Sequence, residues 1–314
     1  MTTQYAGTIP GRHGHARSWA AARAVAVVGL GVLWGATIAL AAEGPPKADK
    51  WRAAWAPRLY GFCMDTHDEK KRSIPEQAQM LRDLGFDGAG YPLWLDESLE
   101  NNLRTLDQSG LKVYLLHASV SVDPKSPPFD PRLPEAIGKL KGRPVTISVL
   151  LRGFPPGDPR GEEPAVKILR QLGDVAQKAG LRISIYHHTS DWTESLLYTL
   201  KVVDKVNHAQ VGANFNLCHW LMVDGQKDYR PVLRRHADKI FAVTINGAQL
   251  GSKTWTNGLI QPLDRGDFDN RELLATLREI GYRGPIGLMC YGVPGEPREH
   301  LRRSMDVWKS WTRQ

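Results

Sequence analysis

The stretch EPAVKILRQLGDVAQKAGLRISIYHH (163–188) decides the fold class of this chain, because it joins a helical pattern directly to a strand pattern. In its first part, Val166, Leu169 and Leu172 recur at helical spacing and predict an amphipathic helix. Gly180 marks the end of that helix, since glycine readily adopts the left-handed conformation that closes helices. The apolar run that follows predicts a buried strand. A helix followed at once by a strand is the repeating unit of α/β proteins.

The same alternation runs along the rest of the chain. Strand-like runs are separated by helical stretches, of which the clearest cover 74–85, 163–180 and 270–281. The expected strands are 59–64, 86–91, 112–118, 144–151, 182–188, 210–215, 240–245 and 285–291. Eight strands, each followed by a helix, predict a (β/α)8 TIM barrel over 58–314. A doubly wound open sheet is the structural alternative, but no glycine-rich dinucleotide motif or P-loop follows an early strand.

The N-terminal residues fall outside this pattern. Three arginines and no acidic residue precede a charge-free run over 24–42, which has a small-x-small pattern at 39–41. This layout predicts a signal peptide over 1–41 and a linker over 42–57, hence a periplasmic or secreted protein with no stable membrane span in its mature form. A retained membrane anchor is the alternative, because about 19 apolar residues suffice to span a bilayer. N-terminal sequencing of the exported protein would distinguish the two.

Composition and charge describe an ordinary globular domain, with 42% hydrophobic and 24% charged residues. The formal net charge is +8, but the basic residues are spread out, and the densest run is Lys-Lys-Arg at 70–72. A nucleic-acid groove needs a clustered basic stripe, so we expect this run to be a solvated face and expect no nucleic-acid partner. Cys63, Cys218 and Cys290 are too few and scattered for a disulfide framework, and are expected to be buried apolar side chains.

Polar and aromatic side chains gather at the expected strand ends, where TIM barrels carry out their chemistry. These residues are Asp65, His67, Trp94, His117, Arg152, His187, His188, Asn216, His219, Asn246 and Tyr291. Amides and imidazoles suit hydroxyl groups, and aromatic faces such as those of Trp192, Trp220 and Trp255 suit the apolar face of a sugar ring. The sequence therefore predicts a saccharide or polyol ligand. The alternative for each tryptophan is ordinary packing, and for each histidine a hydrogen bond in a loop or core.

Two connections are long for a compact domain, 119–131 and 246–269. Connections longer than about 12–15 residues are usually functional or disordered. The second contains Trp255, Leu259 and Ile260 and is too apolar for disorder. We expect it to form a lid or a wall of the pocket.

Three phrases carry a resemblance to a known family: RISIYHHTSDW (182–192), VGANFNLCHWL (211–221) and IQPLDRGDFDNRELLATLREIGYRGPIGLM (260–289). Through them the chain resembles the xylose-isomerase-like TIM barrel superfamily, which includes sugar phosphate isomerases and epimerases. The resemblance extends from the first expected strand to the last, and looks closest to an exported bacterial subgroup. It implies the barrel fold and a site at the C-terminal ends of the strands.

The resemblance also implies a divalent metal, held by Glu, Asp, His and Glu from strands five to eight. The matching positions here are Tyr186, Asn216, either Thr244 or Asn246, and Met289. Amides, hydroxyls and a thioether do not replace the anionic oxygen ligands that magnesium and manganese need. We therefore expect the family metal site to be lost and predict no cofactor.

One family position is kept, His219, which in relatives neighbours the substrate and the metal. A displaced zinc site is an alternative to a metal-free pocket, because imidazole suits zinc. Its ligands would be His67, His117, His188 and His219. The oligomeric state stays open.

Three functions are open at this point. The first is an isomerase or epimerase-like enzyme on sugars that works without the family metal, and the second is a carbohydrate-binding protein without activity. The third is a metal-dependent phosphodiesterase like the endonuclease branch of the superfamily. That branch binds several metal ions through His, Asp and Glu side chains, and the strand ends here lack the acidic residues. Histidines can act as acid and base near neutral pH, which favours the first. The predicted catalytic residues are Asp65, His67, His117, His188 and His219. The predicted substrate-binding residues are Trp94, Tyr186, Asn216, Asn246 and Trp255.

Overall fold

A computed structural model describes residues 55–66 and 68–312. The predicted signal peptide, most of the predicted linker and His67 lie outside the described residues. Within the described part of the chain, no helix is both long enough and apolar enough to cross a membrane. Trp55, near the end of the predicted linker, donates its indole N–H to the carbonyl oxygen of Tyr282 at 2.8 Å. The chain is therefore held against the domain before the first strand begins.

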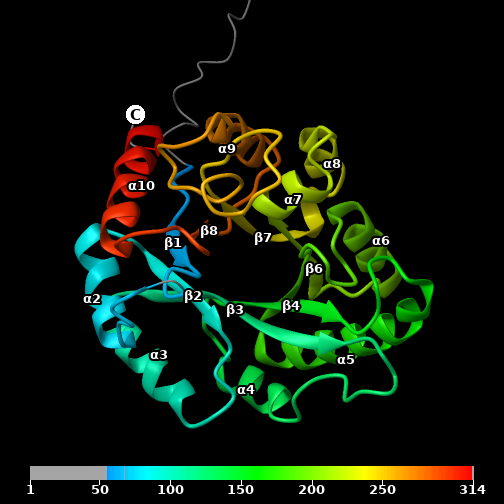
Figure 1. Cartoon of the computed structure of the whole chain (residues 1–314). Helices are drawn as coiled ribbons and strands as arrows, with labels where there is room; N and C mark the ends of the chain where they lie inside the picture. Colours follow the sequence, from blue (N-terminus) through cyan, green and yellow to red (C-terminus); the bar gives the residue numbers. More distant parts are fainter. Residues whose placement is uncertain (1–54, 67, 313–314) are drawn as a thin grey trace, which may run out of the picture. The chain divides into compact units, whose positions relative to one another are not determined.

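The strands form a closed parallel barrel in sequence order, in which the last strand pairs with the first. They are β1 Leu59–Phe62, β2 Gly88–Pro92, β3 Lys112–Ser121, β4 Thr146–Arg152, β5 Arg182–Tyr186, β6 Val211–Asn216, β7 Ile240–Ile245 and β8 Ile286–Met289. Figure 1 shows these strands in the middle of the molecule with the helices around them. The predicted (β/α)8 barrel is confirmed, and each predicted strand is present with its ends shifted by no more than three residues.

The helices form the outer layer and bury one face against the sheet. They are α2 Ile74–Leu84, α3 Ser98–Gln108, α4 Leu133–Lys139, α5 Glu162–Ala179, α6 Leu196–Val206, α7 Leu217–Val223, α8 Tyr229–Arg235, α9 Asn270–Glu279 and α10 Pro297–Thr312, with short 3₁₀ turns η1 Pro159–Gly161 and η2 Ala237–Lys239. The three helices predicted most clearly correspond to α2, α5 and α9.

Local sequence explains where α2 and α5 begin and end. Ser73 and Glu76 form a capping box at the start of α2, in which the Glu76 carboxylate accepts from the Ser73 backbone N–H at 2.7 Å. Gly85 and Gly180 follow the two helices with φ values of 87° and 70°, in the left-handed region that favours glycine. The helices thus stop where the chain must turn back into the barrel.

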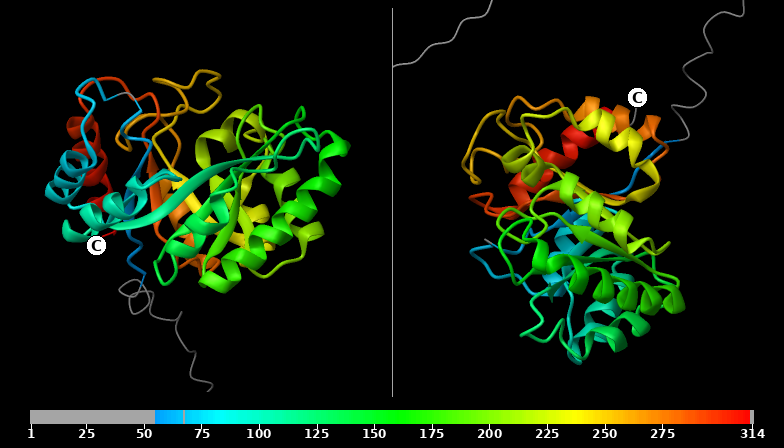
Figure 2. Two further views of the ribbon diagram at one scale, coloured as in Figure 1. Left: turned by 90° about the horizontal axis from the view of Figure 1, so that it is seen from below. Right: turned by 90° about the vertical axis from the view of Figure 1, so that its right-hand side faces the viewer.

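The loops that follow the strands leave the barrel on one face. Figure 2 (left) shows the connection after β1, drawn in blue, and the connection 246–269, drawn in yellow to orange, projecting on the same side. The second connection folds on itself through bridges such as Gly247 with Gln261 and Ala248 with Gly266. This face carries the C-terminal ends of all eight strands.

Close packing inside the barrel depends on a glycine in β2. A Cβ atom added at Gly88 would lie 2.0 Å from the backbone oxygen of Lys112 and 2.8 Å from the ring of Tyr114. Such distances cannot be relieved by a side-chain movement alone, because one of the atoms belongs to the paired strand β3. Glycine at this position is therefore a requirement of strand pairing.

Gly88→Ala is expected to lower the free energy of unfolding by about 1–3 kcal/mol, the usual cost of overpacking. Gly138→Ala is the matched control, because nothing lies within 4 Å of an added Cβ at Gly138 in α4. That change should raise stability by about 0.5–1 kcal/mol, since alanine loses less entropy in a helix. Urea unfolding of both variants measures this, and equal effects would contradict the packing argument.

Candidate functional site

A cavity of about 480 Å³ opens at the C-terminal ends of the strands. This volume falls within the range of small-molecule sites, roughly 300–1,000 Å³. Six of the predicted site residues line it: Asp65, His117, Tyr186, His188, His219 and Trp255. Arg152 and Tyr291, also predicted at strand ends, line it as well, and so do Thr189 and Ser190, which the sequence did not single out.

Asn216, predicted to bind substrate, is fully buried and does not line the cavity. Its side-chain amide donates to the hydroxyl of Tyr186, and its oxygen accepts from the thiol of Cys218 at 2.9 Å. The same oxygen caps α7 by accepting from the backbone N–H of His219 at 3.5 Å. Asn216 therefore supports the cavity wall from behind.

Asn246 and Trp94, the other predicted binding residues outside the cavity wall, have partners of their own. The amide of Asn246 is buried and donates to the backbone oxygens of Gly247 and Leu259. It therefore holds the connection 246–269 in shape. The ring of Trp94 lies 5.1 Å from that of Tyr91 and packs against the core.

The connection 246–269 forms a wall of the cavity, as predicted, through Trp255 and Ile260. The ring of Trp255 lies 5.1 Å from that of His219. Trp192 and Trp220, which were candidate sugar-stacking rings, are instead buried in the core. The indole of Trp192 donates to the backbone oxygen of Asp158 at 2.8 Å.

Histidines form the polar centre of the cavity. The rings of His188 and His219 lie 4.2 Å apart, and both lie near the ring of Tyr186, at 6.0 Å and 5.7 Å. His117 lines the same cavity, and its ring lies 5.8 Å from that of Phe62 in an edge-to-face arrangement. His187 is buried and its Nε2 accepts from the backbone N–H of Asn216 at 3.0 Å, so it supports the fold.

Burial keeps these imidazoles neutral near pH 7. It lowers the pKa of His117 to about 4 and the pKa of His219 well below its ordinary value. Burial also lowers the pKa of His188, although the carboxylate of Asp191 acts in the opposite direction. Burial raises the pKa of Asp65, whose carboxyl group also lines the cavity. The three imidazoles that line the cavity, those of His117, His188 and His219, are thus neutral proton donors and acceptors.

One loop residue contacts both central histidines. The backbone oxygen of Thr189 lies 2.9 Å from Nδ1 of His188. The backbone N–H and the hydroxyl of Thr189 lie 3.2 Å and 3.0 Å from Nδ1 of His219. Oδ2 of Asp191 lies 3.7 Å from Nδ1 of His188. The other carboxylate oxygen of Asp191, Oδ1, accepts from Nε of Arg152 at 3.0 Å.

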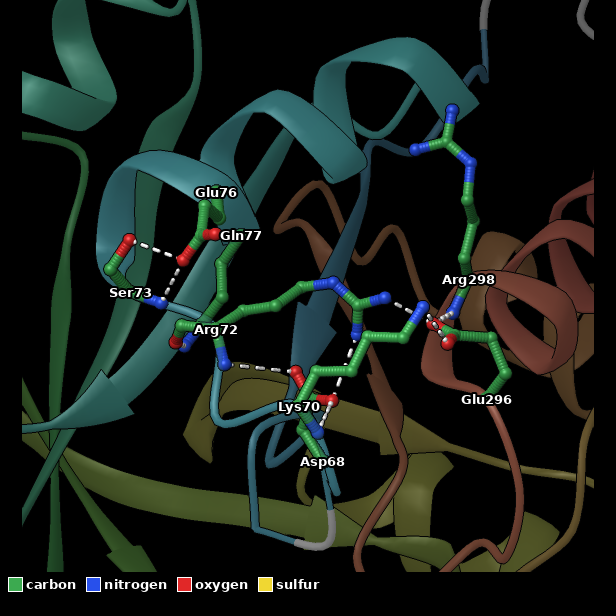
Figure 3. Close-up of polar contacts among 8 residues, drawn as sticks. All are labelled: Asp68, Lys70, Arg72, Ser73, Glu76, Gln77, Glu296 and Arg298. Carbon is green, nitrogen blue, oxygen red and sulfur yellow. Dashed lines mark hydrogen bonds and ion pairs between the residues drawn. The ribbon is translucent and has the colours of Figure 1, made fainter.

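The loop that carries Asp65 is anchored by a charge cluster, shown in Figure 3. Arg72 binds Asp68 at 2.8 Å and also Glu296, which precedes α10, and Lys70 binds Glu296 at 2.8 Å. The run 70–72 was expected to be a solvated face. Lys70 and Lys71 are exposed, but the expectation is wrong for Arg72, whose side chain is only 13% exposed. The cluster joins the connection after β1 to the connection after β8.

The four positions that match the family metal ligands do not fit a hard divalent ion. The side chains of Tyr186 and Asn216 bond to each other, and strand register places Thr244 beside Asn216. Thr244 Oγ1 is buried without a hydrogen-bond partner among the described residues, and Met289 offers only a thioether. None of these groups is a carboxylate, which such ions require.

The histidines of the predicted zinc cluster are a second set of possible metal ligands. Within residues 55–66 and 68–312, no three His, Cys, Asp or Glu side chains are grouped so that they could hold a metal ion. His67, one of the four predicted zinc ligands, lies outside the described residues.

The closed barrel and its mouth cavity define a TIM barrel with a site of small-molecule size. The family model of the xylose isomerase-like TIM barrel matches residues 78–311. The chain therefore belongs to the xylose isomerase-like TIM barrel family, as its sequence resemblance implied. A comparison with curated proteins finds no match.

Solved structures share this fold at low sequence identity. A xylose isomerase domain protein from Alicyclobacillus acidocaldarius has a TM-score of 0.66 and 17% identity over 81% of this chain and 98% of that chain. The 3-keto-D-glucoside 4-epimerase from E. coli has a TM-score of 0.65 and 15% identity over 81% and 99%. An AP endonuclease, family 2, from Brucella melitensis has a TM-score of 0.63 and 17% identity over 81% and 98%. These similarities show the fold alone.

Arg72→Met is expected to lower the free energy of unfolding by about 3 kcal/mol, because it leaves the buried carboxylate of Asp68 without its charged partner. Arg298→Met is the matched control. Its ion pair with Asp83 is exposed, at 48% and 36%, so its loss should cost less than about 1 kcal/mol. Denaturant unfolding measures both, and similar small losses would show that the cluster does not anchor the loop.

Proposed function

We propose that this protein binds a saccharide or polyol in the mouth cavity and acts on it as an isomerase or epimerase-like enzyme, without the metal of its relatives. The observation that carries the proposal is the pair of neutral imidazoles, His188 and His219, whose rings lie 4.2 Å apart on the wall of the cavity. His117 and Asp65 lie on the same cavity and provide further polar contacts.

The surface of the cavity suits a sugar ring. Trp255 and Tyr186 offer aromatic faces for the apolar side of the ring, and Phe62 and Ile260 extend that surface. The histidines offer donors and acceptors for hydroxyl groups. A protein of the same fold is a 3-keto-D-glucoside 4-epimerase, which supports a carbohydrate substrate. Because we expect the chain to be exported, a free or oxidised saccharide suits it better than a phosphorylated intracellular one.

Neutral imidazoles supply the acid and base chemistry that an isomerase needs. A neutral ring has one nitrogen that accepts a proton and one that donates a hydrogen bond. The lowered pKa values keep His117 and His219 in this form at neutral pH. Proton transfer to and from carbon can then proceed through side chains of the chain itself.

Two other functions are distinguished by specific observations. A binding protein without activity is favoured by the loss of all four family ligand positions, and the experiment below separates it from an enzyme. A phosphodiesterase that acts on nucleic acid shares the fold, as the endonuclease from Brucella shows. Asp65 is the one carboxylate among the described residues that line the cavity, whereas a multi-metal cluster needs several.

Saccharide binding should appear as a rise in the melting temperature when the full chain is screened against mono- and disaccharides. Trp255→Leu and His219→Ala should weaken binding of the best sugar by about tenfold or more, the equivalent of about 1.4 kcal/mol. Trp311→Leu is the matched control and should leave affinity unchanged, because Trp311 does not line the cavity.

Turnover is then tested in heavy water. Deuterium incorporated at a carbon of the bound sugar indicates an enzyme, whereas binding without exchange indicates a binding protein. If no sugar stabilises the chain, or if the cavity variants bind as well as the wild type, the proposal is contradicted.

Metal analysis provides a separate test. Protein purified without an affinity tag should contain no stoichiometric magnesium or manganese, because the matching positions provide no carboxylate. A chelator should leave its melting temperature unchanged. Stoichiometric manganese or magnesium would overturn the proposal, and stoichiometric zinc would favour the displaced site at His67, His117, His188 and His219.

A further inference from the structure

We infer that Thr189 holds His188 and His219 in opposite tautomers, so that His188 presents a base and His219 presents a hydrogen-bond donor to the same ligand. This inference rests on the proposed function and deepens it. It assigns different roles to two rings that look equivalent from their positions on the cavity wall.

The tautomer of His188 follows from its contact with a carbonyl group. Nδ1 of His188 lies 2.9 Å from the backbone oxygen of Thr189. A carbonyl oxygen only accepts, so Nδ1 must carry the proton of the neutral ring. Nε2 then keeps its lone pair and has no hydrogen-bond partner in the described part of the chain. The side chain is 37% exposed and lines the cavity, so this nitrogen is available as a base.

The tautomer of His219 follows from the opposite contact. The backbone N–H of Thr189 lies 3.2 Å from Nδ1 of His219, and an amide N–H only donates. Nδ1 must therefore be unprotonated, and it can also accept from the Thr189 hydroxyl at 3.0 Å. The proton of the neutral ring is then on Nε2. Because the described residues offer Nε2 no partner, it can donate to a ligand in the cavity.

Asp191 is a positioning residue for His188. Its Oδ2 lies 3.7 Å from Nδ1 of His188 and otherwise has no hydrogen-bond partner among the described residues. Arg152 holds the other carboxylate oxygen at 3.0 Å. When His188 gains a proton on Nε2, the nearby negative charge of Asp191 stabilises the imidazolium ion, as the carboxylate does in Ser-His-Asp sites.

These roles define the substrate class as a sugar with a carbonyl group next to a carbon that bears hydrogen and hydroxyl. The C–H bond breaks and its proton moves to Nε2 of His188. The electron pair of that bond forms a C=C bond, and the carbonyl π pair moves to oxygen, where the N–H of His219 stabilises the enediolate. Return of the proton to the other face of the same carbon restores the carbonyl group and gives an epimer. Its delivery to the former carbonyl carbon, together with transfer of the hydroxyl proton to the former carbonyl oxygen, forms a carbonyl group at the neighbouring carbon and gives an isomer. No oxidant or further reactant is needed.

Nitrogen-15 spectra of the ligand-free full chain test the tautomers directly. At pH 7, two-bond proton–nitrogen correlations should show His188 protonated on Nδ1 and His219 on Nε2. Spectra of His188→Gln and His219→Gln assign the signals by their disappearance. Both rings in the same tautomer, or either ring doubly protonated, would overturn the inference. This measurement does not depend on sugar turnover, so it can fail or succeed separately from the proposed function.

Asp191→Asn tests the positioning role with the best sugar of the binding screen. Deuterium exchange should slow roughly 100-fold or more, while sugar affinity stays within about twofold. Asp174→Asn is the matched control, because Asp174 pairs with His208 at 3.3 Å on the outside of the barrel. It should change neither quantity. Loss of affinity in Asp191→Asn, or unchanged exchange, would overturn the role given to Asp191.

Discussion

Backbone pairing between β1 and β8 closes the sheet, and the position of each side chain of the candidate site depends on that closure. In a closed parallel barrel, all strands end at one rim, so residues far apart in sequence meet there. Asp65 follows β1 and Tyr291 follows β8, and both line the cavity. The ion pairs of Arg72 with Asp68 and Glu296 hold the two connections together. The rim is therefore stabilised by hydrogen bonds within the barrel and by a partly buried charge cluster outside it.

The absence of carboxylates at the family ligand positions explains why the nearby histidine His219 is neutral. Where the family resemblance implies a carboxylate, the amide of Asn216 donates to the hydroxyl of Tyr186, and the two side chains satisfy each other. Burial raises the pKa of Tyr186 well above its ordinary value, so the phenol stays protonated. With no carboxylate at these positions to favour a charged imidazole, burial decides the state of His219 and lowers its pKa. Tyr186 and His219, at the centre of the mouth, are therefore both neutral.

Some features were predictable because they depend on neighbours in sequence. Apolar runs and amphipathic spacing located the strands and helices, and Gly85 and Gly180 marked helix ends through their left-handed backbone. Other features could not be predicted, because they depend on contacts with residues that are distant in sequence. Trp192 looks like a surface ring after a strand but is buried, with its indole bonded to the backbone of Asp158. Arg72 belongs to a basic run and is therefore expected to be solvated, but the barrel places Glu296 beside it and the two side chains form an ion pair.

The sequence by itself determined the barrel, the face on which a site must lie, and the absence of carboxylates at the four family ligand positions. The periodicity of apolar residues and the residue types are enough to predict these three features, because they indicate which positions are buried and which carry a charge. Only the tertiary structure decided which polar groups reach the cavity and in which form. The side-chain amide of Asn246 donates to the backbone oxygen of Leu259 and so holds a loop in place. His219 accepts a hydrogen bond from the backbone N–H of Thr189, which lies 30 residues away in sequence. The proton state of an imidazole depends on the donor or acceptor beside it, and chain folding alone places that partner.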